Sequence, residues 1–382
     1  MRLLILNWRC PRHPKAGGAE ILTHEIARRL VRRGHSVEWF SASFPGALAQ
    51  EDIDGIRFVR AGRQWTVHWH AFQRYRRRLV GDFDLVIDEI NTVPFFTPLW
   101  ARKPTLMLMY QLAREVWWYE TPFPLNAIGF MLEPLYLRFY RTAPVLTISQ
   151  STSDDLRKLG FRGPVTIMPV GVEAVDDAGL PKTETPTFVY VGRLTASKRV
   201  DDIVRAFAMF NAEAAHGELW LIGDGPDRYE RSLRALAARL GVADRVRFWG
   251  RLGADEKHRK MAEAHALVMA SVREGWGLVV NEANACGTLA IAYDVPGLRD
   301  AIADRETGLL VEPTPRALKD AMMLVWSHPT LRTELSGRAR IRNKAISYEI
   351  TADLADRTIS RTITGVGVAA ETAGTTAEIA ES

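Results

Sequence analysis

Two basic side chains lie close together in the sequence, directly after a predicted strand. Arg193 and its neighbour Gly192 follow the apolar run at 188–191, and Lys198 comes five residues after Arg193, just before a predicted helix. Cations at the carboxyl end of a strand and at a helix N-terminus are well placed to bind a diphosphate. A basic loop that contacts only solvent is the alternative.

Two glutamates lie eight residues apart in the segment REGWGLVVNEANACG, at 273–287. Glu274 falls in a predicted loop, because the Gly-Trp-Gly that follows it is typical of a turn. Glu282 falls on a predicted helix over 278–285. The two carboxylates therefore need not have the same task.

The first loop, residues 9–20, places Gly17 and Gly18 at the N-terminus of a predicted helix. Backbone N–H groups at such a position can bind an anion, and a plain tight turn is the alternative. The loop does not fit G-x-G-x-x-G, which argues against a dinucleotide site.

The elements that must position these residues alternate between strands and helices, and the alternation occurs twice. The expected strands of the first half are at 3–6, 37–40, 85–87, 105–109, 145–148 and 165–168, with helices at 19–33, 65–79 and 151–159. Those of the second half are at 188–191, 219–222, 246–248, 267–269 and 289–292, with helices at 200–214, 228–240 and 254–264. This rhythm predicts an α/β protein with two doubly wound parallel sheets, joined by a polar linker at 176–186.

Composition narrows the class of protein. The chain has 382 residues, enough for about two domains, and only two cysteines, Cys10 and Cys286, too few for a disulfide framework or a cysteine-based zinc site. No secretion signal and no apolar run of ~18 residues is present, so we expect a cytoplasmic protein. The net charge is +5, with 23 basic and 18 acidic residues up to residue 177 and 27 of each after it. The excess on the first half leaves an anionic membrane, an acidic substrate or a nucleic acid as alternative partners.

The segment WTVHWHAFQRYRRRL, at 65–79, bears on this choice. Its aromatic residues Trp65, Trp69 and Phe72 share one predicted helical face, and four arginines follow at 74–78. The face either lies at the interface of a membrane or packs against the core. The arginine run lacks a recognisable module for nucleic acid, so we expect no nucleic-acid partner.

Two Asp-x-Asp pairs, at 52–54 and 82–84, match the spacing of metal-dependent sugar transferases. Both pairs fall at predicted turns, which favour aspartate for local reasons. We therefore expect no metal site.

The motifs GGAE at 17–20, VGRL with Lys198, IGDGP at 222–226 and Glu-x7-Glu followed by ANACG occur in this order. In this order the sequence resembles the family 4 retaining glycosyltransferases over nearly the whole chain. The resemblance implies a GT-B fold, in which two Rossmann-like domains face each other across a cleft. It implies an N-terminal acceptor-binding domain over 1–178 and a C-terminal nucleotide-sugar-binding domain over 187–345. A helix at 346–364 would pack back on the body, and we expect a disordered tail at 365–382.

The resemblance also implies roles for single residues. Arg193 and Lys198 would hold the donor diphosphate, Glu282 the ribose hydroxyls, and Glu274 the hydroxyls of the transferred sugar. The remaining donor-binding positions would be Gly17, Gly18, Gly192, Asp224, Gly225, Trp249, Arg251, Gly275, Trp276, Gly277 and Leu278, with Trp249 and Arg251 near the nucleobase.

One residue departs from the family pattern. Where such enzymes often have a histidine just past the fourth or fifth strand, this chain has Tyr110. We expect the Tyr110 hydroxyl to contact the transferred sugar as a catalytic group. His13 of the first loop is either a substitute for the missing histidine or a surface residue without a function. A low-activity or non-catalytic sugar-nucleotide-binding protein is the alternative, and an epimerase is a second one.

The expected activity is that of a retaining, metal-independent hexosyltransferase without a cofactor, whose nucleotide diphosphate-sugar is a substrate. UDP and GDP donors are both compatible with the motifs. The acceptor hydroxyl would belong to a glycan, a lipid-linked sugar or a small molecule, in cell-envelope or polysaccharide biosynthesis. Peripheral contact with the inner face of the membrane is part of this expectation.

Overall fold

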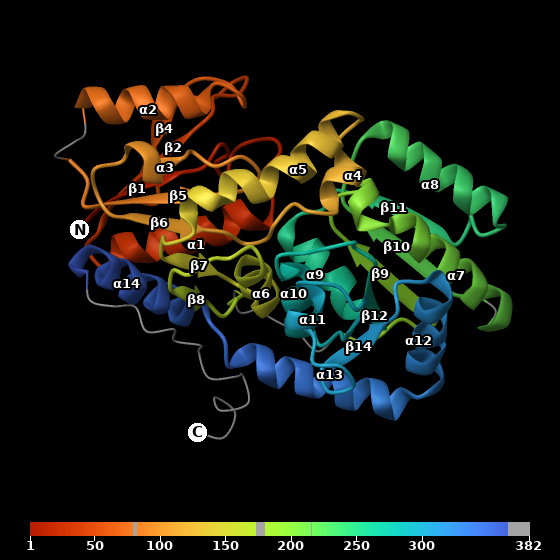
Figure 1. Ribbon diagram of the computed structural model, residues 1–382. Helices are drawn as coiled ribbons and strands as arrows, with labels where there is room; N and C mark the ends of the chain where they lie inside the picture. Colours follow the sequence, from red (N-terminus) through yellow and green to blue (C-terminus); the bar gives the residue numbers. More distant parts are fainter. Residues whose placement is uncertain (79–81, 173–179, 215, 366–382) are drawn as a thin grey trace. The chain divides into compact units, whose positions relative to one another are not determined.

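The computed structural model describes residues 1–78, 82–172, 180–214 and 216–365 (Figure 1). The chain forms two compact units. Unit 1 contains Met1–Arg114, Ile128–Gly171 and the C-terminal segment from Ser347, and unit 2 contains Glu115–Ala127 and Val172–Ile346.

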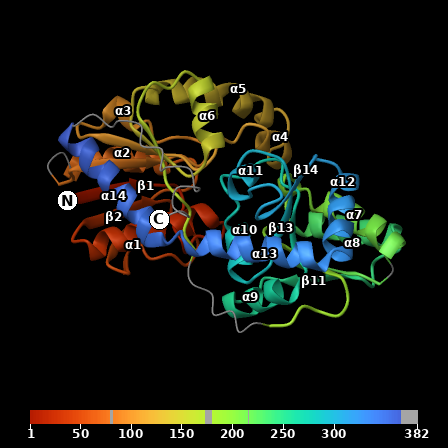
Figure 2. The same ribbon diagram turned by 90° about the horizontal axis from the view of Figure 1, so that it is seen from below.

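Unit 1 is built on an eight-stranded sheet of order β3-β4-β2-β1-β5-β6-β7-β8, parallel except for the β3/β4 pair. Its strands are β1 (Arg2–Leu6), β2 (Ser36–Ser41), β3 (Gln50–Ile53), β4 (Ile56–Arg60), β5 (Leu85–Glu89), β6 (Thr105–Leu108), β7 (Val145–Thr147) and β8 (Val165–Ile167). Its helices are α1 (Gly18–Arg32), α2 (Val67–Arg78), α3 (Thr97–Trp100), α5 (Leu125–Leu137), the 3₁₀ turn η1 (Arg138–Tyr140), α6 (Gln150–Lys158) and α14 (Tyr348–Thr364). Helices α1 and α14 lie side by side on one face of the sheet, and α2 and α3 cover the other (Figures 1 and 2).

Unit 2 is built on a six-stranded, wholly parallel sheet of order β11-β10-β9-β12-β13-β14. Its strands are β9 (Thr187–Val191), β10 (Glu218–Ile222), β11 (Val246–Gly250), β12 (Ala266–Met269), β13 (Ala290–Tyr293) and β14 (Gly308–Val311). Its helices are α4 (Val116–Glu120), η2 (Ala196–Lys198), α7 (Val200–Ala214), α8 (Asp227–Arg239), α9 (Ala254–Glu263), α10 (Leu278–Ala285), α11 (Leu298–Ala301), α12 (Pro315–Ser327) and α13 (Pro329–Lys344). Every residue of β9 is buried, as expected for a central strand covered on both faces.

The predicted fold class is confirmed, because two doubly wound, Rossmann-like parallel sheets are present. The sequence analysis did not foresee β3, β14 or helices α3, α4, α5, α11, α12 and α13. It also placed residues 1–178 in one domain, whereas the contacts assign Glu115–Ala127 to unit 2. Residues 176–179 of the predicted linker and 366–382 of the predicted tail lie outside the described residues. In the part of the chain that is described, no helix has the length and apolar character needed to cross a bilayer.

The predicted C-terminal helix is α14, which begins after Ser347, whose Oγ accepts the Ile350 N–H at 3.4 Å. Its start lies very close to Gly171, where an added Cβ would come within 2.2 Å of the Tyr348 nitrogen. Only glycine therefore allows α14 to begin at this place. Thr351 Oγ1 also donates to the Pro169 carbonyl oxygen at 2.7 Å.

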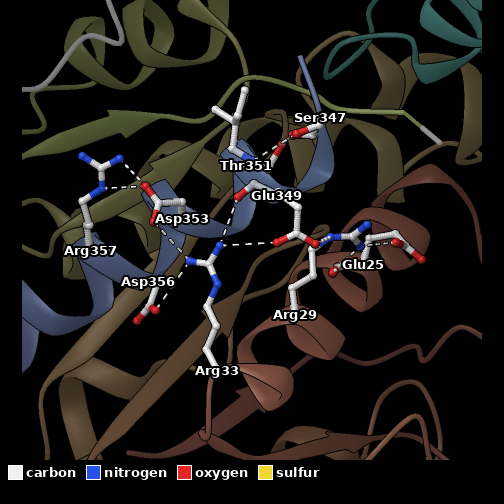
Figure 3. A network of polar contacts seen from close by, with 10 residues as sticks. Glu25, Arg29, Arg33, Ser347, Glu349, Thr351, Asp353, Asp356 and Arg357 are labelled. Atoms are coloured by element: carbon white, nitrogen blue, oxygen red, sulfur yellow. Dashed lines mark hydrogen bonds and ion pairs between the residues drawn. The ribbon is translucent and has the colours of Figure 1, made fainter. Parts of the chain in front are cut away.

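A network of ion pairs joins α14 to α1 within unit 1 (Figure 3). Arg29 Nε lies 2.8 Å from Glu349 Oε1. Arg33 lies 3.5 Å from Glu349, 3.3 Å from Asp353 and 3.6 Å from Asp356. A single exposed pair contributes little, but a cation shared by three carboxylates forms a network that fixes how the two helices pack.

We expect Arg33→Ala to lower the free energy of unfolding by about 1 kcal/mol, because three partly exposed carboxylates lose a shared cation. The loss should shrink at high salt, since screening already weakens these pairs in the wild type. Urea denaturation at low and high salt measures both effects. Arg32→Ala is the matched control, because Arg32 is exposed and has no ion pair within the described ranges. Equal losses in the two variants would contradict the assignment.

Candidate functional site

The candidate site lies at the carboxyl ends of β9 and β12, neighbouring strands of unit 2. From β9 the chain continues to β10 on one side, whereas β12 leads to β13 on the other. Ligands of doubly wound sheets bind at such a switch point. The loops after these two strands carry the two predicted clusters, 192–198 and 270–277.

Lys198 and Glu274 meet in this place. Lys198 Nζ lies 2.5 Å from Glu274 Oε1, and Ser271 Oγ donates to the same oxygen at 2.7 Å. The two side chains are 18% and 13% exposed, so water screens their attraction only in part. The structure thus joins two residues that the sequence analysis had placed in separate clusters.

Arg193 lies on the same loop, with an exposed side chain. Its backbone is held firmly, because the Tyr190 hydroxyl donates to the Arg193 carbonyl oxygen at 2.7 Å. Burial raises the pKa of Tyr190 well above its ordinary value, so this hydroxyl remains a donor. Among the described residues the Arg193 guanidinium has no ion pair. A fixed backbone with a free cation suits an anionic ligand.

Glycines of the IGDGP motif allow the loops after β9 and β10 to touch. An added Cβ on Gly223 would lie 1.9 Å from the Gly192 carbonyl oxygen, and one on Gly225 would lie 2.0 Å from the Leu194 carbonyl oxygen. The Leu194 N–H donates to the Asp224 carbonyl oxygen at 2.7 Å. These glycines and the Asp224 backbone therefore support the loop that carries Arg193.

Helix α10 starts where the sequence predicted, after Gly277 with its positive φ of 95°. Leu278 is its first residue, and the preceding Gly275 and Trp276 form the turn. Trp276 Nε1 donates to Asn281 Oδ1 at 2.9 Å. The Trp276 indole thereby ties the turn after Glu274 to the helix.

Glu282 lies on α10 with its carboxylate 2.7 Å from Lys257 Nζ of α9. The sequence analysis missed Lys257, because one lysine on a charged helix gives no signal. The pair holds the Glu282 carboxylate in one orientation, and both side chains remain partly exposed.

Trp249, next to last in β11, and Arg251, directly after this strand, were predicted to lie near a nucleobase. The Trp249 ring packs edge-on against Trp220 at 6.0 Å, and Lys260 Nζ lies 4.8 Å from its centre. The Arg251 side chain is exposed.

Helix α4 contacts both loops of the site. Glu120 accepts hydrogen bonds from the N–H of Ser197 at 3.2 Å and from its Oγ at 2.5 Å. Glu115 pairs with Arg273 at 2.8 Å. Each of these partners immediately precedes a member of the Lys–Glu pair described above. Through them α4 holds the two loops in place, a role that the sequence did not suggest.

The predicted anion contact at Gly17 is not supported, because its N–H is already used inside unit 1. It donates to Glu20 Oε2 at 2.7 Å in a capping box at the start of α1, whose first residue is Gly18. The GGAE motif itself carried this signal, since a glutamate three residues after a helix cap is typical of such a box.

Tyr110 is buried, and its hydroxyl lies 2.7 Å from Thr23 Oγ1. Burial raises the pKa of Tyr110 well above its ordinary value. The structure gives this hydroxyl a partner inside unit 1 in place of the predicted sugar contact.

A buried acid near Tyr110 went unnoticed in the sequence. Glu89 ends β5 at the switch point of unit 1 and is 1% exposed. Burial, reinforced by the neighbouring Glu20 carboxylate, raises the Glu89 pKa well above its ordinary value. Glu20 itself lies 2.8 Å from Arg9 Nε and accepts a hydrogen bond from Asn91. One carboxylate of the two is therefore neutralised by a cation and the other by a proton.

His13 lines a hollow of about 680 Å³ in unit 1. Its ring packs edge-on against Trp8 at 5.3 Å and Phe44 at 5.2 Å. His13 Nδ1 accepts the Lys15 N–H at 3.0 Å, so Nε2 carries the proton of the neutral ring. Partial burial, helped by Arg9 and Lys15, lowers the His13 pKa and favours this neutral form.

The two Asp-x-Asp pairs occupy turn and edge positions of unit 1. Asp54, with a φ of 52°, pairs with His24 at 3.2 Å, and Asp84 accepts the Arg2 N–H at 2.7 Å. Within the described ranges no three side chains of His, Cys, Asp or Glu converge as metal ligands would.

Comparisons with known proteins show what the chain is similar to. The family model described as "Glycosyltransferase Family 4" matches residues 16–175, and "Glycosyl transferases group 1" matches residues 173–342. The GDP-mannose-dependent alpha-(1-6)-phosphatidylinositol monomannoside mannosyltransferase of Mycobacterium tuberculosis is 27% identical over 332 residues, which are 78% of this chain and 82% of that protein. The D-inositol 3-phosphate glycosyltransferase of Jonesia denitrificans is 33% identical over 176 residues, 44% of this chain and 41% of that protein, so this match spans less than half of the relative. The sucrose-phosphate synthase of Thermosynechococcus elongatus has the same fold, with a TM-score of 0.80, 23% identity and coverage of 95% of this chain and 99% of that one.

We expect Glu89→Gln to stabilise the protein at neutral pH. The native state keeps Glu89 protonated, whereas the unfolded chain loses this proton above pH ~4.3, so wild-type stability falls as the pH rises from there to the raised native pKa. The amide that the substitution introduces has no proton to lose. The difference in unfolding free energy between the variant and the wild type should therefore grow by up to about 1.4 kcal/mol per pH unit. Denaturation between pH 4 and 7 measures it, and a constant difference across this range would show that Glu89 is ionised when folded.

Proposed function

Because the chain belongs to the family 4 glycosyltransferases, we propose that it moves a sugar from a nucleotide diphosphate donor to an acceptor hydroxyl, with retention at the anomeric carbon and without a metal ion. The observation that carries the proposal is the pairing of Lys198 with Glu274 at the switch point of unit 2, with the free Arg193 on the same loop as Lys198. The mannosyltransferase of Mycobacterium tuberculosis, 82% of which is matched by this chain, is named as dependent on GDP-mannose. This name supports a nucleotide diphosphate-sugar as the donor.

The two cations act on the leaving group. When the bond between the anomeric carbon and the diphosphate oxygen breaks, its electron pair stays on the diphosphate, whose charge grows while the sugar becomes oxocarbenium-like. Once the donor is bound, Lys198 and Arg193, held on one loop, stabilise this charge without a further rearrangement as the bond breaks. Two preorganised cations are thus sufficient to support departure of the diphosphate.

The pairing of Lys198 with Glu274 fixes the positions of both side chains before the donor binds. In this state each charge neutralises the other, and Ser271 keeps the carboxylate in place. On donor binding, Lys198 Nζ transfers its contact to a phosphate oxygen, and Glu274 then accepts hydrogen bonds from hydroxyls of the transferred sugar. Glu282, oriented by Lys257, accepts those of the ribose.

Retention follows if the acceptor approaches from the face that the diphosphate leaves. The acceptor oxygen forms the new bond to the anomeric carbon, and its proton passes to the departing phosphate oxygen. A separate side-chain base is then unnecessary, which agrees with the inward position of the Tyr110 hydroxyl.

The acceptor side is assigned to unit 1. Its hollow lies at the carboxyl ends of β1, β2 and β4 and combines the aromatic rings of Trp8 and Phe44 with the cations Lys15 and Arg63. Aromatic faces and polar side chains suit a sugar or cyclitol ring. The names of the two relatives include a phosphatidylinositol mannoside and an inositol phosphate, which supports a lipid-linked or small polyol acceptor in cell-envelope biosynthesis. We place the enzyme in the cytoplasm, at the inner face of the membrane.

The competing function is a sugar-nucleotide-binding protein without turnover, which the inward Tyr110 hydroxyl would also allow. Such a protein would bind the donor but neither hydrolyse nor transfer its sugar.

We expect Arg193→Ala and Lys198→Ala each to lower the turnover number by about 10²–10³, because each removes a cation that acts on the leaving group. Glu282→Ala should mainly raise the donor KM, since the ribose lies away from the breaking bond. Steady-state kinetics at saturating donor separate the two effects. Near wild-type turnover in both cation variants, with circular dichroism unchanged, would refute the role of the pair.

We expect activity to survive EDTA, because Arg193 and Lys198 supply the positive charge that a metal ion would otherwise provide. The measurement is initial transfer rate with EDTA, with manganese and with neither. Loss of activity in EDTA that manganese restores would show that the reaction needs a metal.

A further inference from the structure

Helix α5, labelled in Figure 1, and the η1 turn expose an apolar face on unit 1. Together with α3 they present six large apolar side chains that are between 47% and 70% exposed; this apolar strip consists of Leu99, Ile128, Met131, Leu132, Leu135 and Phe139. Those on α5 recur at intervals of one, three and four residues, which places them on one side of the helix. A surface helix of a water-soluble protein normally turns such a face toward the core.

The orientation of the helix is fixed by its opposite face. Glu133 is buried and accepts the N–H groups of Ala113 at 2.6 Å and Arg114 at 2.7 Å. The Tyr136 hydroxyl donates to the Thr92 carbonyl oxygen at 2.5 Å, and Leu137 is buried in the core. Rotating α5 to hide the apolar strip would break these bonds and bury the Glu133 carboxylate without partners. The apolar strip therefore faces outward as a consequence of how the helix is held.

Along the segment that carries most of the apolar strip, the exposed charges have one sign. Between residues 128 and 142 the exposed charged side chains are Arg138 and Arg141, and the acid of this segment, Glu133, points inward. A basic border on an apolar face is complementary to the headgroups of an anionic bilayer. Two copies of the chain meeting through this face would bring their arginines together without an acid on the strip to pair with them.

The apolar strip is continuous with the helix for which the sequence suggested membrane contact. Phe139 packs against Phe96 at 5.9 Å, at the start of α3. At the end of α3, Trp100 packs against Phe72 of α2 at 5.9 Å, and Phe72 in turn packs against Trp69 at 5.5 Å. Trp69 and Trp65 are exposed, so the alternative in which they pack against the core is wrong.

The arginines of α2 contribute less than the sequence suggested. Arg74 is paired with Glu38 at 2.9 Å. The structure does not describe the side chains of Arg77 and Arg78. The strip on α5, which the sequence analysis did not single out, presents the larger apolar face.

We propose that the apolar strip of unit 1 is the membrane-binding surface of this protein and inserts into the interfacial zone of an anionic bilayer. Helix α5 then lies in the plane of the interface, with Arg138 and Arg141 at the level of the phosphates. This deepens the proposed function by naming the surface through which an enzyme with a lipid-linked acceptor stays near its substrate. Binding of the bilayer by this surface does not require sugar transfer.

The test is co-sedimentation of the full chain with vesicles of phosphatidylcholine, with and without phosphatidylglycerol. The wild type should bind the anionic vesicles and release from them as salt rises. Met131→Gln combined with Leu135→Gln should weaken this binding by about tenfold or more, since two apolar side chains no longer enter the interface. Arg138→Gln combined with Arg141→Gln should weaken it and flatten its salt dependence.

The matched control is Met209→Gln combined with Ile341→Gln, because both residues are apolar and exposed but lie on unit 2. It should bind vesicles as the wild type does, and circular dichroism of every variant checks the fold. No binding of the wild type, or equal binding of the strip variant and the wild type, would overturn the proposal. So would a dimer in sedimentation velocity that the strip variant abolishes, if vesicles do not bind.

Because vesicle binding is measured without donor or acceptor, its result stands apart from that of the transfer assay. An enzyme that transfers sugar but ignores vesicles would refute the membrane surface alone. A protein that binds vesicles through the apolar strip but shows no turnover would refute the proposed function alone.

Discussion

The parallel pairing of β9 with β12 is the contact on which the candidate site depends. The two strands are separated by more than 70 residues of sequence, yet their register places the loops that follow them side by side. The N–H of Val272 donates to the Ser197 carbonyl oxygen at 2.9 Å, which joins the loops directly. Lys198 and Glu274 meet because of this junction and not because of any local preference of either loop. Close packing then makes the junction stiff, since Gly297 lies so near Glu274 that an added Cβ would come within 2.1 Å of the Glu274 carbonyl oxygen.

A carboxyl group at least partly shielded from water lies at the switch point of each unit, and its charge is compensated in a different way in each. In unit 2 a partly exposed carboxylate is balanced by an ammonium group that a ligand can take over. In unit 1 burial raises the pKa of Glu89 well above its ordinary value and so favours the neutral acid, while Glu20 pairs with Arg9. The partly exposed Lys198–Glu274 pair can exchange partners at a small cost in free energy. A buried neutral acid such as Glu89 is better suited to a structural role.

The fold was predictable because its signals are local and repeated. Buried parallel strands such as β9 appear as apolar runs, and α10 is bounded by a glycine on either side, so its limits were predicted to the residue. The pairing of Lys198 with Glu274 was not predictable, since it depends on strand order. The same holds for Lys257 and for α4, whose contacts with the site are made with residues remote in sequence. The motif comparison suggested that the Tyr110 hydroxyl contacts the transferred sugar. In the structure Tyr110 is buried and its hydroxyl contacts Thr23, and a single sequence does not reveal this burial.

The return of α14 to unit 1 affects how the chain can be made. During synthesis on a ribosome, the strands of the first sheet emerge early, but the helix that covers α1 emerges only after all of unit 2. Until then one face of the first sheet lacks part of its cover, and the carboxylates that pair with Arg33 have not yet been translated. The nascent first sheet is therefore exposed to chaperones or to wrong contacts for most of translation. A ribosome that stops near residue 346 would release a second unit complete in sequence and a first unit that is not.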